Sequence, residues 1–545
     1  MKKMLVVLMV IVMVLPTISV SAKEVATLPA FDVYFNGNKV ESEYRKYPLL
    51  VYKDITYFPM TYFDSRHLGI VTEWDGETNT LAISKKNINS ILTAYKGESK
   101  NQTENDVSIC NFNIIVNGKA IDTKTEPYPL LTFRDVTYFP LTWLFAVDEF
   151  GWEYSFDEDA GLSINSSNHR VKMLDLSALE MNSLYDGFTC DGDYYYHHNS
   201  ATGNIYRTPV DDLDNQEVIY HIESGVPAGL GFSDGKVFLS YRSGSATMGT
   251  NYSYYINKDK TLTEATKPSR NGGVSRYHAY GDGVTAELSC FTGDWSFCYY
   301  IGENKTEVEI PGISFGTPGR HFSDEVIPPQ IVGDNIYVIG YKGEEEVKIL
   351  YSINVKTGEI LEIEDNVDNF KAYDSNNEFG QVVIYTQEGC LDQYIVDANE
   401  YREIRENSGT FIDMIQIMQE DEDYIEKSPF WGMYVITKDD KGTYVDVYGN
   451  PNGSVPPPYQ GRERLMTFSA NTSFSYYNGY LVARDKSENP SARLVVFHTS
   501  NEGYNSHVKT PFVSADDATA LTIFGDTLIY RNVETGEFCE VNLKP

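Results

Sequence analysis

Residues 47–59 read YPLLVYKDITYFP, and residues 128–140 read YPLLTFRDVTYFP. The two stretches lie 81 residues apart and are identical at nine of their thirteen positions. The same offset aligns Asn36-Gly37 with Asn117-Gly118. Because Asn-Gly is a preferred two-residue turn between paired strands, each copy is predicted to begin as a β-hairpin. The N-terminal part of the chain therefore carries an internal duplication.

The proline of each copy is followed by a predicted short helix, over residues 60–68 and 141–150. Each predicted helix leads into strand-forming sequence with an aromatic-Asp pair, Trp74-Asp75 in the first copy and Phe156-Asp157 in the second. Each copy is thus predicted to be a small α+β module. The polar residues 96–106 between the copies are predicted to be a loop.

The order of these motifs resembles the copper amine oxidase N-terminal-like, or stalk, domain of Firmicutes over about residues 31–167. The resemblance implies a non-catalytic appendage that either attaches the protein to a wall or partner or acts as a spacer. The oxidase itself places its cofactor tyrosine in a Thr-x-x-Asn-Tyr-Asp/Glu motif. Here Asn251-Tyr252 is followed by Ser253, and the sequence has no His-x-His copper pair. We expect no copper amine oxidase activity.

From about residue 170 onward the sequence consists of β-rich runs separated by Gly, Asp and Asn. The clearest unit combines Gly192-Asp193-Tyr-Tyr-Tyr196, Gly203-Asn-Ile-Tyr206-Arg207 and Val218-Ile-Tyr220. From Gly192 to the last such opening at Gly525, 333 residues span seven intervals of about 48 residues each. This spacing is typical of the blades of a β-propeller.

The two ends of this region predict how the ring closes. The last unit holds three predicted strands between residues 520 and 541, and an additional strand at Val171–Leu176 precedes the first unit. We expect the early strand to complete the last blade, which gives eight blades, with seven as the alternative. The first unit resembles lipoprotein-receptor-like β-propeller repeats, and this resemblance implies a binding propeller with no catalytic residues to carry over.

The predicted fold class is therefore multidomain, with two small α+β stalk modules and an all-β propeller. A chain of 545 residues is too long for one hydrophobic core. The predicted boundaries are a signal peptide at 1–22, the first stalk module at 23–88, a linker at 89–111, the second stalk module at 112–168 and the propeller at 169–545.

The first residues have the layout of a secretory signal peptide. Lys2 and Lys3 precede an apolar run over residues 4–15, and small residues lead to Ala22, after which we expect cleavage. The apolar run is shorter than the roughly 20 residues that span a bilayer, so no transmembrane anchor is expected after cleavage. The predicted location is extracellular, either free or associated with the cell wall.

The charge narrows the choice of partners. The chain has 44 Lys and Arg against 78 Asp and Glu, a net charge of −34, and loss of the two N-terminal lysines gives −36. Such a field repels phosphate-bearing polymers, so nucleic acid is not an expected partner. Tyrosine outnumbers phenylalanine 41 to 27, and its amphipathic ring suits contacts with a protein or a carbohydrate. A monomer is expected.

Six cysteines in an exported chain permit disulfides without forming a dense framework. Cys290 and Cys298 flank a predicted hairpin and form the candidate disulfide. No Cys or His spacing predicts a zinc site, and no metal site or cofactor is expected. The acidic runs at 211–215 and 420–423 are the weak alternatives for calcium, because such runs are usually solvated loops.

Candidate functional residues are few. Gly312-Ile-Ser314-Phe-Gly316 fits the GxSxG pattern, but its setting between β units and prolines argues against a nucleophile elbow. The adjacent His197 and His198 on one predicted strand should face opposite ways and so should not share a metal ion. Arg276, His278, Arg320 and His321, in predicted loops leading into blades, are the weak candidates for ligand contacts.

These observations predict a secreted or wall-associated, non-enzymatic binding protein that presents a propeller to a protein or glycan. The first alternative is a propeller glycosidase or polysaccharide lyase that uses carboxylates and a histidine. The second alternative is a structural spacer without a ligand. Fold alone does not separate these functions.

Overall fold

The structure is a computed structural model that describes residues 24–544, with gaps of which the longest are 317–325, 375–380, 417–431, 450–461 and 499–510. The chain divides into two compact units. Unit 1 contains residues up to 86 and residues 92–168, and unit 2 contains residues 87–91 and 169–545. Among the described residues, no helix has the length and hydropathy needed to cross a membrane.

Unit 1 is built around a closed six-stranded barrel to which both sequence copies contribute. The strand order around the barrel is β1 (Glu24–Thr27), β4 (Leu50–Tyr52), β5 (Ile55–Pro59), β12 (Val136–Pro140), β11 (Leu131–Phe133) and β8 (Glu104–Ile109). The first three strands come from the first copy, and the last three are their counterparts in the second. The order is therefore that of an internal twofold axis.

The pairing of β5 with β12 marks this axis. The two strands are antiparallel, and Phe58 lies opposite Phe139, the residue at the equivalent position of the other copy. Both side chains are fully buried, and their ring centroids lie 6.3 Å apart in an edge-to-face arrangement. The Thr-Tyr-Phe-Pro segment thus forms the core of unit 1 by pairing with its own repeat.

Two further sheets of unit 1 contain strands from both copies. One has the order β10 (Lys119–Ile121), β9 (Asn113–Val116), β7 (Thr80–Lys85) and β6 (Ile70–Asp75), and the other has the order β13 (Glu153–Asp157), β14 (Gly161–Asn165), β2 (Val33–Phe35) and β3 (Asn38–Lys39). The central pairs, β7 with β9 and β14 with β2, are parallel and each joins one copy to the other.

The interlocked copies differ from the expectation of two successive modules at 23–88 and 112–168 joined by a linker at 89–111. β8 lies inside the predicted linker and pairs with β1 and β11. Its sequence, ENDVSI, is polar enough to suggest a loop, yet only alternate side chains face the core, and Val107 is buried. Each copy alone would leave open strand edges, and the other copy covers them.

The Asn-Gly turns are confirmed and also join the copies. Asn36-Gly37 and Asn117-Gly118 adopt positive φ at both positions, as a two-residue hairpin turn requires. Asn36 Oδ1 accepts a hydrogen bond from Ser166 N at 2.8 Å, and Asn117 Oδ1 accepts one from Lys85 N at 2.9 Å. Each turn therefore fixes a strand end of the opposite copy.

The two predicted helices are present but differ in type. α1 (Tyr62–His67) is an α-helix, whereas η1 (Leu144–Glu149) is a π-helix. Pro59 and Pro140 lie 81 residues apart, but the glycines after the helices, Gly69 and Gly151, lie 82 apart. The second copy thus holds one extra residue, and a π-turn absorbs a one-residue insertion without a change in the flanking strands.

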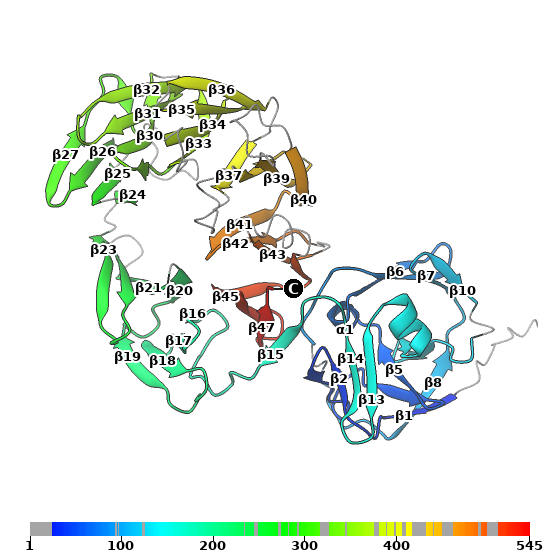
Figure 1. Cartoon of the computed structure of the whole chain (residues 1–545). Helices are drawn as coiled ribbons and strands as arrows, with labels where there is room; N and C mark the ends of the chain where they lie inside the picture. The colour runs from blue at the N-terminus through cyan, green and yellow to red at the C-terminus, as the bar shows by residue number, and fades with distance from the viewer. Residues whose placement is uncertain are drawn as a thin grey trace, which may run out of the picture. The chain divides into compact units, whose positions relative to one another are not determined.

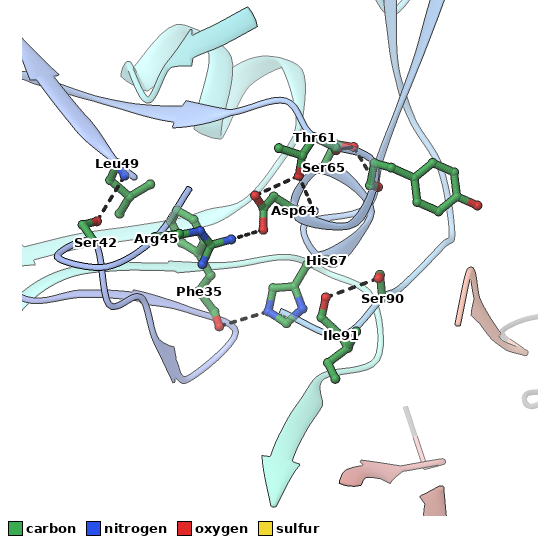
Figure 2. Close-up of polar contacts among 11 residues, drawn as sticks. Phe35, Ser42, Arg45, Leu49, Thr61, Asp64, Ser65, His67, Ser90 and Ile91 are labelled. Atoms are coloured by element: carbon green, nitrogen blue, oxygen red, sulfur yellow. Dashed lines mark hydrogen bonds and ion pairs between the residues drawn. The ribbon is translucent and has the colours of Figure 1, made fainter. Parts of the chain in front are cut away.

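A buried ion pair stabilises α1. The carboxylate of Asp64 contacts the guanidinium of Arg45 (Figure 2), and both side chains are almost completely buried. Thr61 caps the helix, because its Oγ1 accepts from Asp64 N at 3.1 Å and donates to Asp64 Oδ2 at 2.8 Å. A buried carboxylate with these partners needs no solvent to satisfy its charge.

We predict that Phe139→Ala strongly destabilises unit 1, by about 3–5 kcal/mol, because the change leaves a cavity on the internal axis. Urea unfolding followed by tryptophan fluorescence measures the effect. Phe156→Ala is the matched control, because Phe156 is 53% exposed and should change the free energy of unfolding by less than about 1 kcal/mol. Equal effects of the two changes would contradict the central role of the β5–β12 pairing.

Unit 2 contains antiparallel sheets of four or five strands, eight of them among the described residues (Figure 1). The first four consist of β15 (Val171–Leu174), β47 (Phe538–Asn542), β46 (Thr527–Asn532) and β45 (Ala518–Phe524); β16 (Phe188–Cys190), β17 (Tyr194–Asn199), β18 (Asn204–Pro209) and β19 (Glu217–His221); β20 (Ala228–Ser233), β21 (Lys236–Ser243), β22 (Thr250–Ile256) and β23 (Leu262–Arg270); and β24 (Val274–Gly281), β25 (Val284–Phe291), β26 (Asp294–Ile301) and β27 (Asn304–Val308).

The other four sheets follow in chain order. They consist of β28 (Ile313–Ser314), β29 (Gln330–Val332), β30 (Asn335–Lys342), β31 (Val347–Asn354) and β32 (Ile360–Asp365); β33 (Val367–Asp374), β34 (Gln381–Gln387), β35 (Cys390–Ile395) and β36 (Glu400–Arg405); β37 (Thr410–Gln416), β38 (Gly432–Lys438), β39 (Thr443–Gly449) and β40 (Arg462–Phe468); and β41 (Thr472–Tyr477), β42 (Tyr480–Asp485), β43 (Leu494–His498) and β44 (Phe512–Ser514).

The sheets are arranged as in a β-propeller. Neighbouring sheets contact each other through edge strands: β16 contacts both β45 and β20, and β29 contacts both β24 and β33. β15 pairs antiparallel with β47, from Val171 opposite Val541 to Leu174 opposite Phe538. This pairing confirms the predicted closure, in which an early strand completes the last sheet of the chain.

A short segment from the region between the two sequence copies belongs to unit 2. Residues 87–91 lie along β44, and Asn89 forms a parallel bridge with Ser514. The carboxylate of Asp516 fixes the end of this segment, because it accepts hydrogen bonds from Ser90 Oγ at 3.0 Å and from Ile91 N at 2.9 Å. Tyr530 donates a third bond at 2.6 Å.

Burial disfavours the ionised form of the Asp516 carboxylate. Asp516 is fully buried, and desolvation raises its pKa to about 6 although the hydrogen bonds from Tyr530, Ser90 and Ile91 act in the opposite direction. Since the folded pKa lies above the unfolded value of about 3.9, the folded state binds more protons between those values. The contribution of Asp516 to stability is therefore largest below pH 4 and falls as the pH rises to 6.

We predict that the stability of the wild type relative to Asp516→Asn falls by up to about 3 kcal/mol between pH 4 and pH 7. The variant lacks the titrating group, so the difference isolates its linkage. Urea unfolding of both proteins at several pH values measures this difference. A difference that stays constant, or that grows in favour of the wild type as the pH rises, would contradict the buried, ionising carboxylate.

Candidate binding surface

The structure corrects the placement of the predicted ligand-contact residues. Arg276 and His278 lie on strand β24, opposite Ser289 and Glu287 on β25, rather than in a loop. The segment forms a full strand because it pairs with β25 along its whole length, from Val274 opposite Phe291 to Gly281 opposite Val284. Arg320 and His321 lie outside the described residues. The proposal that the four residues contact a ligand stays a prediction.

The strand register contradicts the predicted disulfide. Cys290 on β25 is opposite Trp295, and Cys298 on β26 is opposite Glu287. Because side chains alternate along a strand, the two thiols leave opposite faces of the sheet and no disulfide can join them. The expectation was wrong because the strands pair with Phe291 opposite Asp294, whereas a Cys290–Cys298 pair would need a register centred on Asp294.

His197 and His198 lie on β17 and face opposite ways, as expected, and both are fully buried. His197 Nε2 lies 3.1 Å from Thr208 Oγ1, and its ring stacks on Tyr206 with centroids 4.9 Å apart. Burial lowers the pKa of His197 to about 4 and also lowers that of His198. Both rings are therefore neutral at physiological pH and belong to the packing of unit 2.

We predict that His197 makes unit 2 sensitive to acid. Its folded pKa lies below the unfolded value of about 6.5, so its contribution to stability is present above pH 6.5 and is lost as the pH falls towards 4. His197→Gln, which keeps a polar group near Thr208, should show a smaller loss of unfolding free energy over this pH range than the wild type. Parallel pH profiles of the two proteins would contradict the prediction.

The remaining sequence candidates carry no site chemistry among the described residues. Ser314 lies on β28, and its Oγ donates to Gly316 O at 2.8 Å, a local turn rather than a strand-to-helix elbow. Asp212 and Asn215 take part in consecutive turns, with Asn215 N bonded to Asp212 O. Residues 420–423 lie outside the described part of the chain, and within that part no group of three or more metal-ligating side chains gathers.

Four tyrosines gather where the sheet β16–β19 packs against the sheet β20–β23. Tyr220 comes from β19, Tyr241 from β21, and Tyr252 and Tyr254 from β22. Tyr241 and Tyr252 lie directly opposite each other, and Tyr254 follows two residues after Tyr252 and shares its face of the sheet. We call these four residues the tyrosine cluster. None of them is fully buried.

The rings of Tyr241, Tyr252 and Tyr254 are nearly parallel, whereas the ring of Tyr220 is tilted by 46° to that of Tyr241 and by 53° to that of Tyr254. Tyr241 and Tyr252 stack with centroids 4.9 Å apart and an interplanar angle of 15°, and Tyr252 and Tyr254 stack at 6.4 Å and 11°. Tyr220 reaches across from the neighbouring sheet, and its hydroxyl lies 3.2 Å from that of Tyr241. The cluster thus presents aromatic rings beside phenol groups that bond to one another.

The phenols of Tyr241 and Tyr254 are neutral. Burial, together with the hydrogen bond and proximity to Tyr220, raises the pKa of Tyr241, and burial also raises the pKa of Tyr254. A neutral phenol both donates and accepts a hydrogen bond. The tyrosine cluster therefore offers apolar rings and uncharged polar groups in one place, which suits a sugar ring or an amphipathic protein segment.

The sequence indicated this surface only in part. The composition shows an excess of tyrosine, but members of the cluster such as Tyr220 and Tyr252 lie more than 30 positions apart in the sequence. The Tyr252-Ser253-Tyr254 alternation on a predicted strand was the available signal for two rings on one face. The contribution of Tyr220 from another sheet depends on the packing of the two sheets and has no local signal.

The comparisons with known proteins find distant structural likenesses alone. No known protein family and no curated protein matches the chain. The chain is similar to oligogalacturonate lyase from Vibrio parahaemolyticus, with 10% identity and a TM-score of 0.28, over 57% of this chain and 98% of that chain. It is also similar to the β-propeller domain of the Trilobed protease from Pyrococcus furiosus, with 11% identity and a TM-score of 0.28, over 48% and 78%.

A third likeness is to TolB from Acinetobacter baumannii, with 11% identity and a TM-score of 0.25, over 58% of this chain and 79% of that chain. Likeness at this level carries no argument about activity or ligand. The propeller assignment rests on the strand pairing of unit 2.

Proposed function

We propose that this chain is an exported, non-enzymatic binding protein in which an eight-bladed propeller presents the tyrosine cluster to a glycan. The observation that carries the proposal is the gathering of four partly exposed tyrosines from two adjacent sheets. Tyrosine is enriched where proteins bind partners, because it combines a large rigid contact area with a polar tip. The mature charge of −36 favours a ligand without negative charge.

Export is supported by the sequence of the first 22 residues, with two lysines, an apolar core and small residues before the expected cleavage site. Eight blades are supported by the eight sheets among the described residues and by the pairing of β15 with β47, which completes the eighth. We assign unit 1 the role of retaining the protein at the cell wall, in keeping with the resemblance of its sequence to stalk domains.

We predict that the mature protein binds a neutral polysaccharide and that Tyr241→Ala/Tyr252→Ala lowers the affinity at least tenfold, because the change removes the stacked pair at the centre of the cluster. A panel of immobilised wall and plant polysaccharides, followed by calorimetry with the best ligand, measures binding. Mass spectrometry of the ligand after incubation should show no cleavage.

Tyr476→Ala is the matched control, because Tyr476 is another exposed tyrosine of unit 2, on β41, away from the cluster in sequence and sheet. It should leave the affinity unchanged. If the double variant binds as well as the wild type, the role of the tyrosine cluster is refuted. If the protein binds proteins but not glycans, the proposed ligand class is refuted. Cleavage of the ligand would favour the lyase or glycosidase alternative.

A further inference from the structure

Unit 1 exposes two aromatic pairs. In one pair the rings of Trp74 and Phe112 meet edge to face, with centroids 5.2 Å apart and an angle of 86°. In the other, the rings of Phe31 and Phe156 meet edge to face at 5.3 Å and 84°. Trp74 is 54% exposed and Phe156 is 53% exposed. We call these two pairs the aromatic platforms.

The aromatic platforms are equivalent under the internal twofold axis. Trp74 and Phe156 belong to the aromatic-Asp pairs of the two copies, and Phe31 and Phe112 lie 81 residues apart. Each platform therefore combines one ring from the first copy with one from the second. The two pairs agree in geometry and exposure although one contains tryptophan and the other only phenylalanine.

Each platform lies at the end of the apolar face of a sheet, next to the part of that face that is buried in the core. Trp74 lies opposite Leu81 on β7, and Phe156 lies opposite Leu162 on β14. Both leucines are buried, whereas the aromatic partners emerge at the end of the same face. Exposed aromatic surface of this kind is unfavourable in water and typical of a contact surface.

Carboxylates surround both platforms. Residues 72–80 carry Glu73, Asp75 and Glu77, and residues 155–160 carry Asp157, Glu158 and Asp159, with no lysine or arginine in either stretch. All six side chains are exposed, and within the described part of the chain no salt bridge engages them. Lys39 follows Phe31 by eight residues, and its ammonium group is paired with a carboxylate: Lys39 Nζ lies 3.0 Å from Asp32 Oδ2.

The aspartates next to the rings are held in the ionised form. Asp75 accepts hydrogen bonds from Thr78 Oγ1 at 2.7 Å and from Glu77 N at 2.9 Å. Asp157 accepts bonds from Asp159 N and Ala160 N, both at 2.9 Å. These bonds lower the pKa of Asp75 and of Asp157, so each platform has an anionic rim at any physiological pH.

We propose that the two aromatic platforms of unit 1 bind a cationic amino-sugar polymer, a wall glycan with free ammonium groups. An exposed ring attracts an ammonium group through its π face, and adjacent carboxylates add Coulomb attraction and hydrogen-bond acceptors. The apolar ring faces also cover the hydrocarbon face of a sugar. A polymer supplies the same group repeatedly, which matches two equivalent platforms on one folded unit.

Two equivalent platforms confer avidity. When one platform holds the polymer, the second binds from a high effective concentration, which raises the overall affinity by roughly 10²–10⁴ over a single contact. A polymer with a regular repeat is favoured over a basic protein segment. The two platforms are equivalent and so bind the same chemical group, which a regular polymer presents at each repeat. This inference rests on the wall-retention role proposed for unit 1 and not on the tyrosine cluster of unit 2.

The test measures binding of the full mature protein to chitosan oligomers and to fully acetylated chitin oligomers of the same length, by calorimetry at low and high salt. We expect binding to chitosan that weakens with salt, and much weaker binding to chitin. Trp74→Ala and Phe156→Ala should each lower the chitosan affinity roughly a hundredfold or more, because only one platform remains, and the double variant should lower it further. A single glucosamine should bind weakly to all proteins.

Trp143→Ala is the matched control, because Trp143 is a 63% exposed tryptophan of unit 1 outside both platforms, and it should leave binding unchanged. Equal binding of chitin and chitosan, tighter binding of polylysine than of chitosan, or full binding by the double variant would overturn the inference. If each single variant halves the stoichiometry and leaves the affinity unchanged, the two platforms bind independently, and the inference that one polymer occupies both is overturned.

Retention on isolated cell wall separates the two proposals. If the wild type binds the wall and the double variant binds equally well, unit 1 retains the protein through another surface and only the platform inference fails. If the wild type does not bind the wall at all, the retention role fails as well. Circular dichroism of the double variant, which alters two exposed side chains, verifies that its fold is intact.

Discussion

An unpaired strand edge is the constraint on which this structure depends. Backbone groups at the edge of a sheet need partners, and an open edge invites association with other chains. In unit 1 each sequence copy supplies three strands of the barrel, and the other copy supplies the three that close it. In unit 2 the edge of the last sheet is completed by β15, from more than 350 residues earlier in the chain. Residues 87–91 extend β44 in the same way.

This mode of completion explains why duplication gave unit 1 its symmetry. A segment that pairs with its own repeat must place equivalent residues opposite each other, as Phe58 and Phe139 are placed in the pairing of β5 with β12. Several features of one copy then have a counterpart in the other, including the Asn-Gly turns and the aromatic-Asp pairs. Where the copies differ by one residue, the difference is confined to the π-turn of η1 and to the turn after the aromatic-Asp pair.

The two units place aromatic side chains in different electrostatic settings. In the tyrosine cluster of unit 2, burial keeps the phenols of Tyr241 and Tyr254 protonated, and the hydroxyl of Tyr241 bonds to that of Tyr220. The aromatic platforms of unit 1 have anionic rims. A chain of strong negative charge gains selectivity in this way, since the same aromatic chemistry favours uncharged ligands at one surface and cationic ligands at the other.

The sequence by itself determined the duplication, the turns, the propeller spacing and the closing role of the strand near Val171, because these depend on local turn chemistry and on repeat length. The tertiary structure alone decided which copy completes which sheet, the strand at 104–109, the register that separates Cys290 from Cys298, and the meeting of Tyr220 with Tyr241. Each of these depends on pairing between segments distant in the chain. The local sequence encodes that a strand forms, whereas its partner is selected by the free energy of the whole fold.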